Sequence, residues 1–225
     1  MNQRSWLTVK TPYRLVEHLG SDASGRKLRL LGVACCRRQP EKKHIWKWLQ
    51  DKQLWVQTLD VAERFADGLV DEEQLRAALD AAFSARQEKL IRMGSHLVCR
   101  DMWACSDDVV LLCYPPRSFL VTRVFHATGG TTRSRPDLWE QCALVRDIFG
   151  NPFRPADFSP EWRTDTALAI ARQMYESRDF SAMPILADAL QDAGCDNARI
   201  LSHCRDVKQV HVRGCWVVDL VLGKE

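Results

Sequence analysis

The stretch Trp55–Phe83, WVQTLDVAERFADGLVDEEQLRAALDAAF, decides the fold class. In its first half, apolar residues recur at helical spacing and stop near Gly68. The expected apolar stripe consists of Val56, Leu59, Ala62, Phe65 and Ala66. The second half opens with Asp71 and has Gln74 three residues later, which is the capping-box pattern of a helix start. The stretch therefore predicts two successive amphipathic helices.

Similar start and stop signals recur along the rest of the chain. Thr11 and Pro12 predict the start of a helix and Gly20 its end. Further helices are expected in the stretches 26–38, 137–150, 164–180, 183–194 and 197–205, with Asp196 as the cap of the last of these. The sequence predicts an all-α fold, a multi-helix bundle of short amphipathic helices. A short irregular or β-containing middle segment stays open, because residues 94–135 give no decisive pattern.

The best candidate for a domain boundary is the loop-like segment HATGGTTRSRP, residues 126–136, whose composition offers little to bury. We expect a basic N-terminal helical part over residues 1–128, a loop over residues 129–136 and a C-terminal helical part over residues 137–225.

The overall composition is that of a globular protein. Of the 225 residues, 46% are hydrophobic and 27% charged. No apolar stretch approaches the roughly 20 residues of a membrane-spanning helix, and the N-terminus lacks the apolar core of a signal peptide. The odd number of nine cysteines favours free thiols in a reducing compartment. We therefore expect a cytoplasmic protein with no membrane partner.

The net charge of +3 is unevenly distributed, and the basic excess lies at the start of the chain. Residues 1–55 contain 12 lysines and arginines but only 4 acidic residues. Within them, residues 37–55 interleave cations with tryptophans, which suits phosphates and stacked bases. The candidate residues for nucleic acid or another acidic partner are Arg37, Arg38, Lys42, Lys43, Lys47 and Trp46. The alternative is a helix that buries Trp48 and Trp55 and exposes its lysines.

Near the C-terminus, thiols and imidazoles are close in sequence. Zinc prefers such ligands, and the candidates are Cys195, Cys204, His211 and Cys215. Because the chain has no Cys-x-x-Cys pair, we commit to no metal site from sequence and keep zinc as the one cofactor to consider. Two other interpretations stay open: Cys215 as a nucleophile beside His203 or His211, and the cysteines as small buried side chains.

The last residues, HVRGCWVVDLVLGKE, have the spacing of a short packed helix between Gly214 and Gly223. Trp216, Val217, Leu220 and Val221 are expected to face the core, and Asp219 is expected to face water.

Several segments at both ends resemble an uncharacterised protein family of planctomycete bacteria. The matching stretches are Arg26–Arg38, Asp60–Leu69, Arg146–Pro155 (RDIFGNPFRP), Pro184–Cys195 (PILADALQDAGC), Leu201–Arg205 (LSHCR) and His211–Glu225 (HVRGCWVVDLVLGKE). The resemblance implies that the two ends belong to one evolved unit. It implies no activity, cofactor or site.

Common catalytic motifs are missing from the sequence. It contains no P-loop, no dinucleotide-binding glycine pattern, no His-Glu-x-x-His and no Gly-x-Ser-x-Gly. We therefore predict no catalytic residue and expect a non-catalytic interaction or accessory protein of a larger cytoplasmic assembly, most readily bound to another protein. The two alternatives are a nucleic-acid-binding protein that uses segment 37–55 and a zinc-stabilised C-terminal module.

Overall fold

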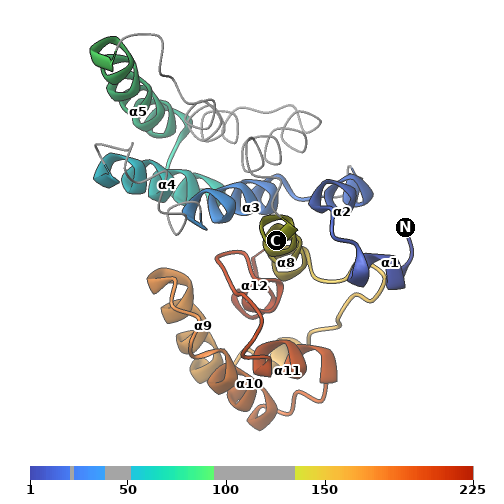
Figure 1. The fold of residues 1–225 in the computed structure, drawn as a ribbon. Coiled ribbons are helices and arrows are strands. Elements are labelled where there is room, and N and C mark those ends of the chain that lie inside the picture. Colours follow the sequence, from blue (N-terminus) through green and yellow to red (C-terminus); the bar gives the residue numbers. More distant parts are fainter. Residues whose placement is uncertain (21–22, 39–51, 94–134, 225) are drawn as a thin grey trace. The chain divides into compact units, whose positions relative to one another are not determined.

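The protein is all-α, as predicted. The computed structural model describes residues 1–20, 23–38, 52–93 and 135–224, and these contain no β-strand (Figure 1). The helices are α1 (Gln3–Thr8), α2 (Pro12–Leu19), α3 (Gly25–Arg38), α4 (Lys52–Ala66), α5 (Glu72–Met93), α8 (Arg135–Phe149), the short 3₁₀ helix η4 (Pro160–Trp162), α9 (Asp165–Ser177), α10 (Met183–Asp192), α11 (Ala198–Arg205) and α12 (Trp216–Leu222).

Contacts divide the chain into two compact units. Unit 1 comprises Met1–Val9 and Cys142–Glu225, and unit 2 comprises Lys10–Gln141. Residues 94–128 of the expected N-terminal part and residues 129–134 of the expected loop lie outside the described residues, so the domain boundaries drawn from sequence stay a prediction.

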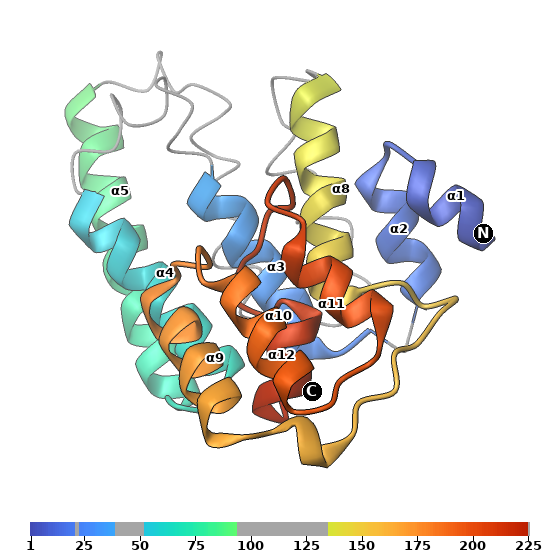
Figure 2. The same ribbon diagram turned by 90° about the horizontal axis from the view of Figure 1, so that it is seen from below.

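In unit 2, α4 packs against both α3 and α5 (Figure 2). The capping box at the start of α5 is confirmed. The Gln74 N–H donates to the Asp71 carboxylate at 2.8 Å, and the Asp71 N–H donates to the Gln74 side chain at 3.1 Å. Arg37 of α3 pairs with Asp60 and Glu63 of α4, and the two carboxylates raise the pKa of Arg37 although burial alone would lower it.

The expected stripe on α4 is wrong at its first position. Trp55, Leu59 and Ala62 are buried, whereas Val56 is 39% exposed. Positions 55, 59 and 62 lie on one helical face, and Val56 lies about 100° from Trp55 around the axis. The larger tryptophan therefore takes the core position.

The core of unit 1 is formed by α9, α10, α11 and α12 (Figure 1). Helix α12 packs against α9 and α11, and α10 packs against both of these. The fully buried side chains of this core include Ala171, Met174, Leu186, Leu190, Ile200, Val217 and Val221. Helix α12 spans seven residues, too few for stability in isolation, so this packing must hold it in place.

Three details of the helices after residue 134 differ from the expectation. Helix α8 begins at Arg135, two residues before Asp137. Helix α11 is capped by Asn197 rather than Asp196, because the Asn197 side chain accepts the N–H groups of Arg199 and Ile200. Asp219 is 1% exposed instead of facing water, since it lies one turn after the buried Cys215 on the same face of α12.

Helix α1 belongs to unit 1 although it lies at the other end of the sequence. Its Trp6 side chain is fully buried. The Arg146 guanidinium, near the end of α8, donates to the Trp6 carbonyl at 2.9 and 3.0 Å and to the Val9 carbonyl at 2.7 Å. A single cation thus holds the carbonyls at the end of α1.

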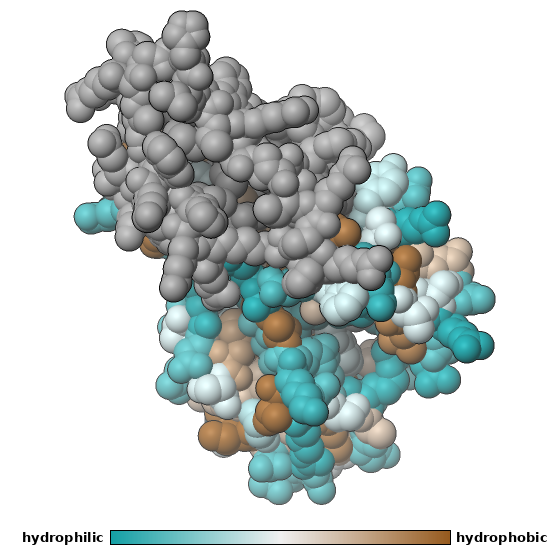
Figure 3. Space-filling model, viewed as in Figure 1, coloured by the Kyte–Doolittle hydropathy of each residue, from teal (hydrophilic) through white to brown (hydrophobic). Residues whose placement is uncertain are grey.

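On the face shown in Figure 3, hydrophilic residues predominate among the described residues, and apolar residues form small separate patches. Among the described helices, none combines the length and the apolar character that crossing a membrane requires.

We predict that Arg146→Lys destabilises the protein by about 1–2 kcal/mol, because one ammonium cannot replace a forked donor that reaches two carbonyls. Urea unfolding measures the loss, and proteases should cut residues 1–9 sooner in the variant. The control is Arg205→Lys, at an exposed arginine that donates to the exposed side chain of Asp188 and to Gln191, where we expect less than about 0.5 kcal/mol. Equal losses in the two variants would contradict the role given to Arg146.

Candidate metal centre

Four side chains with metal-binding atoms meet inside unit 1. They are Asp147 from α8, His203 from α11, and His211 and Cys215 from the loop between α11 and α12. One ligand atom of each lies within 4.8 Å of the other three. Asp147 and Cys215 are completely buried, and the side chains of His203 and His211 are 7% and 6% exposed. The cluster is therefore a closed, internal site.

Asp147 lies at the centre of the cluster. Its Oδ1 atom is 2.9 Å from His211 Nδ1 and 3.4 Å from His203 Nε2, and its Oδ2 atom accepts the Val212 N–H at 3.0 Å. Burial alone would raise the pKa of Asp147, but the hydrogen bonds from the two histidines outweigh burial and lower it. The carboxylate is therefore held in its charged form.

A turn before α12 brings His211 and Cys215 to this carboxylate. The Cys215 N–H donates to the Val212 carbonyl at 2.9 Å, and Gly214 adopts the positive φ of +90° that this turn needs. His211 and Cys215 would also share a face if residues 211–215 formed a helix. In the structure, a turn brings the two side chains together instead.

Trp216, the first residue of α12, orients His203 from the other side. The indole Nε1–H donates to His203 Nδ1 at 3.2 Å, which leaves His203 Nε2 turned toward Cys215 Sγ at 3.2 Å. The indole itself lies against Gly150, where an added Cβ would be 3.3 Å from its ring. The glycine that ends α8 thus also makes room for the tryptophan.

The burial of the cluster's cysteine argues against its being an activated nucleophile. Burial raises the pKa of Cys215 well above its ordinary value, and the nearby Asp147 charge raises it further. His203 does lie next to the sulfur, as the nucleophile interpretation required. However, the side chain is completely buried, and Cys215 is not among the residues that line the pocket described below. A buried thiol of this kind suits a metal ligand, which loses its proton when the metal binds.

The separations between the donor atoms fit a small tetrahedral ion. Bonds of about 2.3 Å to sulfur and about 2.0–2.1 Å to nitrogen or oxygen place tetrahedral ligands about 3.3–3.6 Å apart. The contacts here are 2.9 Å (His211 Nδ1 to Asp147), 3.2 Å (His203 Nε2 to Cys215), 3.4 Å (His203 Nε2 to Asp147) and 3.8 Å (His211 Nδ1 to Cys215). These four separations lie within about 0.4 Å of the tetrahedral range, and all four ligand atoms lie within 4.8 Å of one another.

Charge also favours a divalent cation. With a thiolate at Cys215 and a carboxylate at Asp147, the two negative charges balance one such ion.

The sequence identified half of this cluster. His211 and Cys215 are brought together, whereas Cys195 and Cys204 are buried outside the group of four. Burial raises the pKa of Cys204 to about 12. Asp147 and His203 were not among the ligand candidates. The available signal for Asp147 was a carboxylate between the apolar Val145 and Ile148, which are both buried in α8. His203 was considered only as a base beside Cys215, and its neighbour Cys204 was the ligand candidate.

Most candidates for an acidic partner lie outside the described residues. These are Lys42, Lys43, Lys47 and Trp46. Arg37 and Arg38 end α3, and the Arg37 guanidinium is bound by the two carboxylates of α4. The nucleic-acid interface stays a prediction.

No family model matches this chain, and neither a curated protein nor a solved structure matches it. The resemblance to the planctomycete family therefore stays a prediction as well.

We predict that Gly150→Ala destabilises unit 1 more than Gly194→Ala does. Both glycines have positive φ, +67° and +88°, so both substitutions introduce comparable backbone strain of about 1 kcal/mol. Only at Gly150 would the new Cβ also press on Trp216, because nothing lies within 4 Å of a Cβ at Gly194. Urea unfolding of the two variants gives the difference, and equal losses would show that the contact with Trp216 has no role.

Proposed function

We propose that unit 1 is a zinc-stabilised module, and that the protein is a non-catalytic component that acts by binding other molecules. The observation that carries the proposal is the meeting of Asp147, His203, His211 and Cys215, with one ligand atom from each inside 4.8 Å. These residues come from α8, α11 and the loop before α12, so one ion would tie three parts of the unit together.

The chemistry of the donors favours zinc over other biological cations. A thiolate and two imidazoles are poor ligands for magnesium or calcium, which take oxygen donors, and are ordinary ligands for zinc. Four protein ligands in a buried site leave no coordination position for water or substrate. Such closure is typical of structural zinc sites, whereas catalytic ones keep a position open.

The wider setting belongs to the same proposal. The cysteines of unit 1, which are Cys142, Cys195, Cys204 and Cys215, are free and buried, which fits a reducing compartment such as the cytoplasm. A module without an open metal position has no evident catalytic centre, and this supports an interaction or accessory role.

We expect the purified protein to contain about one zinc ion per chain and to lose it in the variants Cys215→Ser and Asp147→Asn. Elemental analysis gives the stoichiometry. Cobalt substitution should add the sulfur-to-metal charge-transfer band and the intense visible bands of a tetrahedral site with one thiolate.

The matched controls are Cys204→Ser and Cys195→Ser, which change buried thiols outside the group of four. They should keep the metal and the cobalt spectrum. A wild-type protein that binds no metal after refolding with zinc would contradict the proposed function, and metal lost equally from all four variants would contradict the assigned ligands.

We also predict that Trp216→Phe binds zinc more tightly than the wild type, by several-fold to about tenfold. A metal on His203 Nε2 requires the ring proton on Nδ1, where it would face the indole N–H, so the hydrogen bond from Trp216 must open on loading. Phenylalanine removes a bond worth about 1 kcal/mol that opposes the metal. Competition with a chromogenic chelator measures the affinity, and a weaker site in the variant would exclude His203 Nε2 as the ligand atom.

A further inference from the structure

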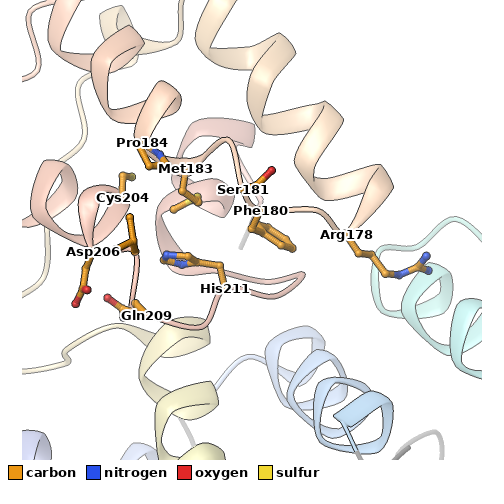
Figure 4. Close-up of a pocket in the computed structure, with 10 residues that line it drawn as sticks. Arg178, Phe180, Ser181, Met183, Pro184, Cys204, Asp206, Gln209 and His211 are labelled. Carbon is orange, nitrogen blue, oxygen red and sulfur yellow. The ribbon is translucent and has the colours of Figure 1, made fainter. Parts of the chain in front are cut away.

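Next to the cluster lies a pocket of about 320 Å³ (Figure 4). Phe180, Met183, Pro184 and Val207 give it apolar walls, and His211 lines it beside the metal-binding group. Figure 4 shows the His211 ring reaching between Met183 and Gln209. The pocket thus borders a side chain that the proposed zinc site uses.

The outer nitrogen of His211 has an unusual position. Its Nδ1 atom faces Asp147 in the cluster, whereas Nε2 is buried and has no hydrogen-bond partner among the described residues. The side chain is only 6% exposed. A histidine bound to a metal through one nitrogen carries a proton on the other and almost always donates it to a carboxylate, a carbonyl or water. Within unit 1, no such acceptor is supplied.

We propose that this pocket binds the C-terminal carboxylate of a partner polypeptide that ends in an aliphatic residue, and that His211 Nε2–H is the donor it meets. The inference rests on the proposed zinc site, because a metal on Nδ1 is what makes Nε2 a donor. Metal loading thereby decides whether the pocket accepts the chain end.

The start of α10 favours a negative group at the same place. Met183 and Pro184, its first two residues, line the pocket, and no side chain caps the helix at Ala182. The Met183 N–H donates to the Phe180 carbonyl at 3.1 Å and proline has no N–H, so these residues offer an anion the positive end of the helix dipole and no hydrogen bond. The one acidic residue of the lining, Asp206, accepts the Lys208 N–H of its own loop, and Figure 4 shows its carboxylate pointing away from His211.

The rim of the pocket suits a chain end and not an isolated ion. Val207, which lines the pocket, is 84% exposed. It is a large apolar side chain that residues preceding the carboxylate would cover. The apolar walls would take the last side chain of the partner, and the buried donor would take its carboxylate.

The test uses the full-length, zinc-loaded protein, with its metal content measured in the same sample. The probe is the peptide acetyl-Ala-Ala-Leu with a free carboxylate, and its controls are the same peptide with a C-terminal amide and the small acid 4-methylpentanoate. Binding is followed by the ¹H–¹⁵N resonance of the imidazole N–H of His211. We expect the free acid to bind with a Kd of about 1 mM or tighter and to move this resonance downfield, and the amide to bind at least tenfold more weakly.

A charge series at Val207 tests the location without touching a metal ligand. Val207→Asp should weaken binding of the acid by about three- to tenfold, Val207→Lys should strengthen it, and Val207→Asn, the uncharged match to aspartate, should change it little. The cobalt spectrum should not change when the peptide binds, because the carboxylate meets the histidine and not the metal.

The contradicting outcomes are distinct. A protein without metal overturns the zinc site and this inference together. A loaded protein that does not distinguish acid from amide, or that is insensitive to charge at Val207, overturns the inference alone. Equal binding of 4-methylpentanoate overturns the polypeptide as occupant, and an altered cobalt spectrum shows an open metal position instead.

Discussion

The structure of unit 1 depends on a carboxylate that is buried and still charged. Asp147 is completely inaccessible, and an isolated carboxylate in such a place would cost several kcal/mol. It is tolerated because the imidazoles of His203 and His211 and the Val212 N–H all turn toward it. These partners come from α11 and the loop before α12, so satisfying one charge determines where both segments lie. A divalent ion among the same atoms would neutralise both Asp147 and the thiolate of Cys215. It would also link α8, α11 and the loop before α12.

The last turn of α8 carries most of this organisation. Arg146 holds the carbonyls of α1, Asp147 gathers the histidines, and Gly150 leaves room for Trp216. Trp216 in turn donates to His203, so the groups that shape the cluster are coupled through direct contacts. The metal and the indole require opposite tautomers of His203. The indole N–H needs an unprotonated Nδ1, whereas a metal on Nε2 leaves the proton on Nδ1. The outer nitrogen of His211 is buried without a hydrogen-bond partner among the described residues, and the His211 side chain lines a pocket.

The sequence predicted the helices well because their signals are local. The capping box at Asp71 and the stop at Gly150 involve residues a few positions apart, and both are present. The expectations were wrong where tertiary packing determines which of two neighbouring residues is buried. Trp55 is buried in place of Val56, and Asp219 is buried on the same helical face as Cys215. The site was harder, since Asp147 lies 56 residues before His203 and no spacing rule connects them. The sequence likewise does not show which of His203 and Cys204 faces the cluster, because adjacent helical residues point about 100° apart and only the fold decides between them.

X-ray absorption at the zinc edge of the purified protein tests the central claim most directly, because it counts the sulfur atoms bound to the metal. The account predicts one sulfur at about 2.3 Å and three nitrogen or oxygen atoms at about 2.0–2.1 Å, the signature of Cys215 with two histidines and Asp147. Two or more sulfur ligands would mean that Cys204 or Cys195 enters the site, and a shell of light atoms alone would exclude Cys215. Either result would contradict the assignment of these four residues as the metal centre.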